Sequence, residues 1–179
     1  MELRWVHEDR PLWDEDKQRV VGGAPAGALD VQYLPGAELP GDWWSARDGE
    51  GAVVGYGWLD ATWGGDAEIL LAVDRSAQQR GVGTFILSSL EKEAGRRGLN
   101  YVYNTIRTTH PDREGVHDWL AIRGYQGSTT DTALRKRTPT DSESAPAAPV
   151  TTDAASLDSA MPPGHEESGG YVDIDDHKY

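Results

Sequence analysis

The sequence predicts an α/β fold: a mixed, mainly antiparallel central sheet flanked by helices, over roughly residues 1–137. Three observations lead to this prediction. Between residues 43 and 73, apolar segments alternate with turn residues, which is typical of a strand meander. Residues 69–97 then give an apolar run, a glycine turn and an amphipathic run, the pattern of a strand followed by a helix. After residue 137 large apolar side chains become rare, so segment 138–179 is predicted to be a disordered acidic tail.

The first forty residues predict one strand and one helix. Residues 3–7 form the strand, and Pro11 favours a helix start that leads into residues 12–21. The glycine-rich residues 22–27 end this helix. Residues 28–41 contain two prolines and predict no regular structure.

The remaining elements follow from periodicity and turn chemistry. A meander is predicted from three strands, with turns at 48–51 and 63–65 between them; the strands cover 43–47, 52–62 and 66–73. A helix over 84–97, ended by Gly98, leads to a strand over 100–107 that lies parallel to the strand 66–73. A helix over 114–123 and weak terminal strands within 125–137 complete the fold.

Composition narrows the classes of function. The chain has no cysteine, which excludes disulfides, thiolate metal sites and a cysteine nucleophile and fits a cytoplasmic location. Its histidines are scattered, so no metal is expected. No apolar run is long enough to span a membrane, and no basic stripe indicates nucleic-acid binding. Of the net charge of −13, −8 lies in residues 138–179. The mildly acidic remainder is consistent with a cationic amine substrate or simply with solubility.

The stretch Gln78-Gln79-Arg80-Gly81-Val82-Gly83-Thr84 is the most informative part of the chain. Two glycines let the backbone turn tightly and present N–H groups in one direction. The helix that begins here adds free amides and the positive end of its dipole, so the turn is suited to phosphate oxygens. A plain structural turn is the alternative. A P-loop is excluded because no Gly-Lys-Ser/Thr follows, and a dinucleotide fold is disfavoured because the third glycine is missing.

Ala67-Glu68-Ile69, followed by Gln78-x-Arg80-Gly81-x-Gly83, resembles the central motif of the GNAT superfamily of N-acetyltransferases. The segment from Trp119 to Tyr125 resembles the late helix of that family. The resemblance implies a GNAT-like fold and acetyl-coenzyme A as the co-substrate. It also implies that backbone groups near the glycine turn hold the diphosphate, while the preceding strand holds the pantetheine arm. The residues that this assigns to the cofactor are Leu71, Ala72, Val73, Gln78, Gln79, Arg80, Gly81, Val82, Gly83 and Thr84.

The same resemblance gives candidates for catalysis. Glu68 stands where some relatives have a general base, and loss of solvent in an apolar strand makes a carboxylate a stronger base. An ordinary outward-facing side chain is the alternative. The late-helix tyrosine that often protonates the departing thiolate is replaced by Leu120. His117 or Tyr103 is the candidate substitute.

The predicted function is transfer of an acetyl group from acetyl-coenzyme A to an amine by direct attack in a ternary complex. The rival is a non-catalytic acyl-coenzyme A binder whose tail recruits a protein partner. Residues 171–179, which mix aromatic, aliphatic and acidic side chains, are the candidate docking peptide. A homodimer also stays open. Trp43, Trp44, Trp58 and Trp63 either line an acceptor pocket or fill the core, and core packing is the preferred alternative.

Overall fold

The structure, a computed structural model, describes residues 1–128 and 130–139. In chain order the elements are β1 Arg4–Glu8, α1 Glu15–Val20, β2 Asp42–Arg47, β3 Val53–Ala61, β4 Asp66–Val73, α2 Val82–Arg96, β5 Tyr101–Thr105, α3 Arg113–Ile122 and β6 Ala133–Arg137. A short 3₁₀ turn, Arg75–Ala77, follows β4. The predicted strands and helices are therefore all present, with ends that shift by a few residues. The predicted tail and docking peptide lie outside the described residues, except for Thr138 and Pro139.

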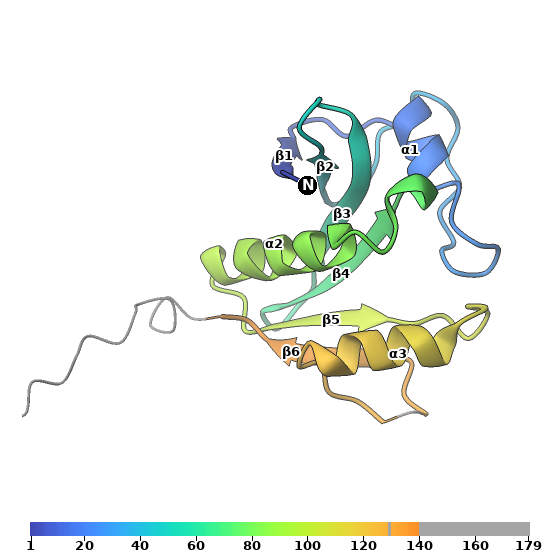
Figure 1. The fold of residues 1–179 in the computed structure, drawn as a ribbon. Helices are drawn as coiled ribbons and strands as arrows, with labels where there is room; N and C mark the ends of the chain where they lie inside the picture. The colour runs from blue at the N-terminus through green and yellow to red at the C-terminus, as the bar shows by residue number, and fades with distance from the viewer. Residues whose placement is uncertain (129, 140–179) are drawn as a thin grey trace, which may run out of the picture. The chain divides into compact units, whose positions relative to one another are not determined.

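The strands form one six-stranded sheet in the order β1-β2-β3-β4-β5-β6 (Figure 1). β4 and β5 are parallel, and every other neighbouring pair in this sheet is antiparallel. The connection through α2 is long enough to return the chain for a parallel pairing. The mixed, mainly antiparallel sheet that the sequence predicts is confirmed.

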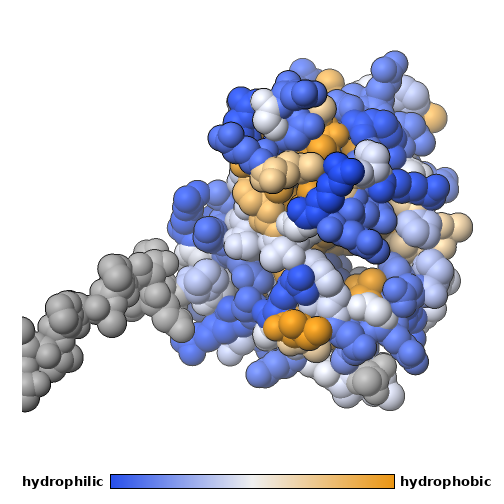
Figure 2. Space-filling view, viewed as in Figure 1, coloured by the Kyte–Doolittle hydropathy of each residue, from blue (hydrophilic) through white to orange (hydrophobic). Residues whose placement is uncertain are grey.

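Helices cover both faces of the sheet. Residues of α2 and α3 belong to one buried cluster, which includes Ile86, Leu90 and Leu120. Residues of α1 belong to a second cluster, which includes Val20 and Trp43. Because side chains alternate along a strand, β4 contributes Ile69 to the first cluster and Ala72 to the second. Figure 2 shows one side of the molecule, where hydrophobic residues are confined to small areas of a mostly hydrophilic surface.

The tryptophans of the meander mostly fill the core. Trp43, Trp44 and Trp58 are buried. Trp43 and Trp58 stack with ring centroids 4.3 Å apart. Trp63, at the turn between β3 and β4, is fully exposed. Core packing is therefore the correct interpretation for the three buried rings.

Helix α1 begins later than the sequence predicts. Pro11 does not start it, because the segment around Leu12 is extended and forms a bridge with Glu38. The Trp13 N–H donates to the Ala37 carbonyl at 2.8 Å. Asp14 then caps the helix, and its Oδ1 accepts from the Lys17 N–H at 2.9 Å. A contact with a distant segment thus overrides the local proline signal.

Candidate functional site

The sheet opens between β4 and β5. These parallel strands pair only from Asp66 with Tyr101 to Glu68 with Tyr103. One residue further, the Asn104 side-chain amide donates to the Ile69 carbonyl at 2.8 Å. β4 continues to Val73, where it pairs with Gly55 of β3. Beyond Ile69, the described residues therefore leave the β5 side of β4 without a strand partner.

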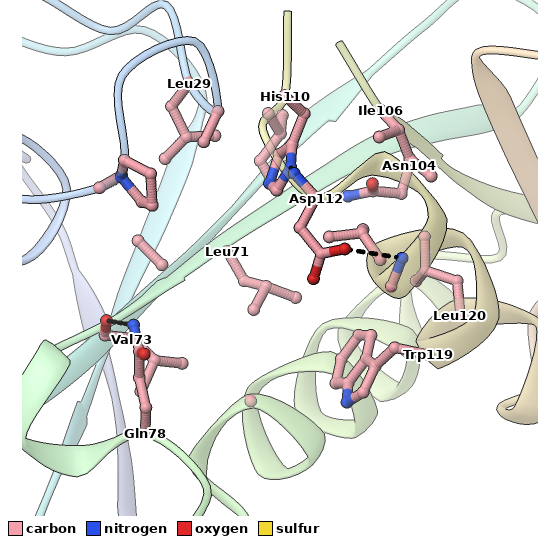
Figure 3. A pocket seen from close by; sticks show the side chains of 18 of the residues that line it. Leu29, Leu71, Val73, Gln78, Asn104, Ile106, His110, Asp112, Trp119 and Leu120 are labelled. Carbon is pink, nitrogen blue, oxygen red and sulfur yellow. Dashed lines mark hydrogen bonds between the residues drawn. The ribbon is translucent and has the colours of Figure 1, made fainter. Parts of the chain in front are cut away.

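A cleft of about 650 Å³ occupies this opening (Figure 3). Its floor and walls come from β4, the turn before α2, the loop after β5 and one side of α3. Leu71 lies near the middle of the view, between Val73 and Gln78 at one end and Asn104 at the other. The loop after α1 closes another side, through Pro25, Ala28 and Leu29. An extended ligand that enters at Gln78 would thus run along the open strand toward Asn104.

The glycine turn forms the mouth of the cleft. Gln79 has a φ of 60° and Gly81 a φ of 83°, so two residues adopt the left-handed conformation in close succession. Alternating backbone handedness of this kind directs N–H groups into one concavity. Gly81 caps α2, and no side chain accepts a hydrogen bond from the first turn of the helix. The amides of that first turn have no intrahelical partner either.

Eight of the ten residues that the resemblance assigns to the cofactor line the cleft: Leu71, Ala72, Val73, Gln78, Gln79, Gly81, Gly83 and Thr84. Val82 is buried in the core instead. Arg80 is exposed and is not among the lining residues. The glycine turn is thus brought together with the open strand, but the Arg80 side chain is not part of that arrangement.

Arg123, at the end of α3, supplies a positive charge that the sequence analysis missed. It lines the cleft, and its Nη2 donates to Thr84 Oγ1 at 2.8 Å. Its guanidinium lies 4.0 Å from the centroid of the Trp119 ring. No carboxylate of the described residues pairs with it, and its buried Nε has no partner among them. A fixed, uncompensated cation therefore stands beside the first turn of α2.

Glu68 and Tyr103 form the last paired rung before the strands separate. Paired residues project to the same face, so both side chains lie on the face that carries Leu70 and α1. Neither lines the cleft, but Leu70, two residues after Glu68, does. Burial, and next the Glu68 carboxylate, raises the pKa of Tyr103. The phenol therefore stays protonated at neutral pH and can donate a hydrogen bond.

Two further predictions for this region concern α3. His117 does not line the cleft, and its Nδ1 lies 3.5 Å from Asp118 Oδ1. Leu120 does line the cleft and is buried. The histidine that lines the cleft is His110, in the loop before α3, which the sequence analysis did not select. A histidine next to a proline in a loop gives no periodic signal, so only the tertiary structure reveals its position.

Two features are absent from the described residues. They contain no cluster of three or more His, Asp or Glu side chains that could hold a metal ion. None of their helices has both the length and the apolar character needed to cross a membrane.

Comparison with known families agrees with this geometry. The Acetyltransferase (GNAT) family matches residues 3–125, and the chain belongs to this family. Among curated proteins, the mycothiol acetyltransferase of Geodermatophilus obscurus is 31% identical over 128 residues. These residues make up 71% of this chain but only 35% of that relative. The chain thus spans about a third of the relative's length.

Solved structures give more distant matches. A phosphinothricin acetyltransferase from Sinorhizobium meliloti, in complex with acetyl-coenzyme A, is 21% identical with a TM-score of 0.44. The match covers 60% of this chain and 66% of that one. The PaiA N-acetyltransferase from Thermoplasma acidophilum, in complex with coenzyme A, is 14% identical with a TM-score of 0.45. That match covers 53% of this chain and 59% of the other.

Proposed function

We propose that this chain transfers an acetyl group from acetyl-coenzyme A to a primary amine by direct attack in a ternary complex. The observation that carries the proposal is the cleft, which joins a helix N-terminus without a side-chain cap to a strand left open beyond Ile69. Free amides and the helix dipole suit a diphosphate, and an open strand edge suits the amides of a pantetheine arm. Membership of the GNAT family supports the same donor.

The catalytic roles are proposals that follow from this placement. The amine nitrogen attacks the thioester carbon, a backbone N–H at Leu71 or Val73 polarises the carbonyl, and the amine proton passes to Glu68. The carbon–sulfur bond then breaks and the thiolate departs. The position of Glu68 at the end of the paired rungs supports its role as base. Tyr103, next to Glu68, stays a predicted proton donor, and so does His117.

The proposal is tested by binding and turnover measured separately. We expect calorimetry to detect acetyl-coenzyme A binding by the full chain, and a thiol reagent to detect coenzyme A release with a panel of amines. The panel should include polyamines, amino acids, peptide N-termini and the acceptor of the mycothiol acetyltransferase. Absence of binding would contradict the proposed donor. Binding without turnover on any amine would instead favour the non-catalytic alternative, which no feature of the described residues supports.

Arg123 gives a sharper test of the donor site. Replacing it with Met removes the charge but keeps much of the length of the side chain. We expect the affinity for acetyl-coenzyme A to fall by about tenfold or more, because hydrogen bonds to a charged group are among the strong ones. Arg80→Met is the matched control and should change the affinity by less than about threefold in the same calorimetric measurement, because Arg80 does not line the cleft. Equal losses of affinity in the two variants would show that binding depends on the total positive charge near the turn and not on the position of Arg123.

Three finer expectations are also proposed. The absence of cysteine supports a cytoplasmic location. Residues 171–179 are proposed as a peptide that docks on a protein partner, and they lie outside the described residues. The homodimer stays a prediction, which the molecular mass in solution would test.

A further inference from the structure

We propose that His110 donates a hydrogen bond from Nε2 to the sulfur of coenzyme A and so stabilises the thiolate as it leaves. This inference rests on the proposed function, since it needs acetyl-coenzyme A in the cleft. It assigns a catalytic role to a residue outside the motifs of the sequence. It also supplies a polar group for the departing thiolate, which the apolar Leu120 at the place of the usual tyrosine does not.

The loop that carries His110 is held in one position. The Thr109 Oγ1 donates to the Gly27 carbonyl at 2.8 Å, and Arg107 pairs with Asp30 at 2.9 Å. Gly27 has a φ of 84°, and a Cβ there would lie 2.2 Å from the Thr109 carbonyl oxygen. The loop after β5 and the loop after α1 therefore meet closely. His110 itself closes a turn, in which its N–H donates to the Arg107 carbonyl at 3.0 Å.

The position of the ring proton follows from one contact. The backbone N–H of Asp112 donates to His110 Nδ1 at 3.0 Å. A backbone N–H can only donate, so Nδ1 accepts and carries no proton. The neutral ring must then hold its proton on Nε2. Asp112 is also the N-cap of α3, so this contact joins the His110 ring to the start of that helix.

The free nitrogen is available to a ligand. His110 lines the cleft and is half-buried. Its Nε2 has no hydrogen-bond partner within residues 1–128 and 130–139, and it is not enclosed as a buried orphan atom. Figure 3 places His110 toward the end of the cleft that holds Asn104 and Ile106, away from Gln78. In the proposed mode of binding, the diphosphate lies at Gln78 and the thioester lies toward Asn104.

The chemistry suits a hydrogen-bond donor better than an acid. A neutral imidazole does not readily give up its remaining proton, whereas it can donate a hydrogen bond to a developing negative charge, as a neutral histidine does in triosephosphate isomerase. When the amine nitrogen bonds to the carbonyl carbon, the carbon–sulfur bond breaks and its electron pair stays on sulfur. The Nε2–H stabilises that thiolate. The sulfur takes up its proton afterwards, from one of the predicted donors Tyr103 and His117 or from water after release, and the amine proton has already passed to the base.

The test uses the product, coenzyme A, and needs no amine. The ultraviolet absorbance of the thiolate gives the pKa of the bound thiol by titration. In the wild-type protein we expect this pKa to lie below that of free coenzyme A. In His110→Phe we expect it to rise, with the acid dissociation constant lowered about tenfold, a change typical of losing one hydrogen bond to a charged group. His110→Gln keeps an N–H donor and should recover part of the difference.

His7→Phe is the matched control, because His7 does not line the cleft. Coenzyme A bound to this variant should titrate as it does in the wild type. Equal thiol pKa values in the wild type and in His110→Phe would overturn the inference. A second measurement needs no variant: the wild type should bind coenzyme A more tightly as the thiol ionises, while its affinity for desulfo-coenzyme A should not follow that rise. An equal response to both ligands would also overturn the inference. Failure of the wild type to bind coenzyme A would refute the proposed function itself.

Discussion

Gly83→Leu is expected to weaken acetyl-coenzyme A binding by at least about a hundredfold while the protein stays folded. Gly83 stands in the first turn of α2 and lines the cleft. A Cβ at this position would lie 3.5 Å from the Trp119 ring, 3.7 Å from the Val73 side chain and 3.9 Å from Leu71. These are ordinary contact distances, so one methyl group fits. A longer side chain must extend into the space between them, which is the proposed path of the donor.

Folding should not suffer, because Leu has a higher helix propensity than Gly by several tenths of a kcal/mol. Calorimetric titration measures the affinity, and chemical denaturation measures the free energy of unfolding. Gly83→Ala should show a small loss of affinity. Gly49→Leu is the control, since Gly49 lies in the exposed turn between β2 and β3 and a Cβ there would have no atom within 4 Å. If Gly83→Leu bound acetyl-coenzyme A as tightly as the wild type, the donor would not bind in this cleft.

A substitution at Gly81 would test the backbone conformation of the turn without adding contacts to the cleft. Its φ of 83° is left-handed, and no atom lies within 4 Å of the position where a Cβ would stand. Any side chain there is strained by about 1–2 kcal/mol, but it meets no wall of the cleft. A substitution at Gly81 therefore acts on the shape of the turn, whereas one at Gly83 acts on the space inside the cleft.

Local signals in the sequence were sufficient for the framework of this site. The apolar run of β4, the paired glycines and the periodic residues of α2 lie within about thirty residues, and each constrains the next. The assignment of Leu71, Ala72 and Val73 to the cofactor rests instead on the resemblance to the family, and the structure leaves this part of β4 open on the β5 side. A strand that pairs with a parallel neighbour for only three residues must leave its remaining edge free on that side.

The missed residues depend on contacts between distant parts of the chain. The loop of His110 is positioned by Gly27, which lies 82 residues before its partner Thr109. The local sequence indicates only that Arg123 ends a helix, yet its guanidinium contacts Thr84, 39 residues earlier. Periodicity in the sequence favours His117, because it sits on a helix, over His110 in a loop. In the structure His110 lines the cleft and His117 does not, since α3 and its cap turn Asp112, Val116 and Leu120 toward the cleft.

Glu68→Gln is expected to lower kcat for amine acetylation by about 10²–10⁴-fold, the usual contribution of a general base. Gln has nearly the same shape as Glu but cannot take up a proton at neutral pH. The KM for acetyl-coenzyme A should change by less than about twofold, because Glu68 does not line the cleft that is proposed for the donor. Steady-state kinetics with an active amine from the panel would measure both constants.

A general base differs from a structural carboxylate in its response to pH. At a pH above the pKa of the free amine, the substrate arrives already deprotonated and no longer needs the enzyme to remove its proton before attack. The deficit of Glu68→Gln should therefore shrink as the pH rises, whereas a folding defect would not recover. Asp60→Asn is the control, since Asp60 pairs with Glu68 across β3 and β4 and is exposed. If Glu68→Gln kept the wild-type kcat, or Asp60→Asn lost as much, the base would have to be another group on this face of the sheet.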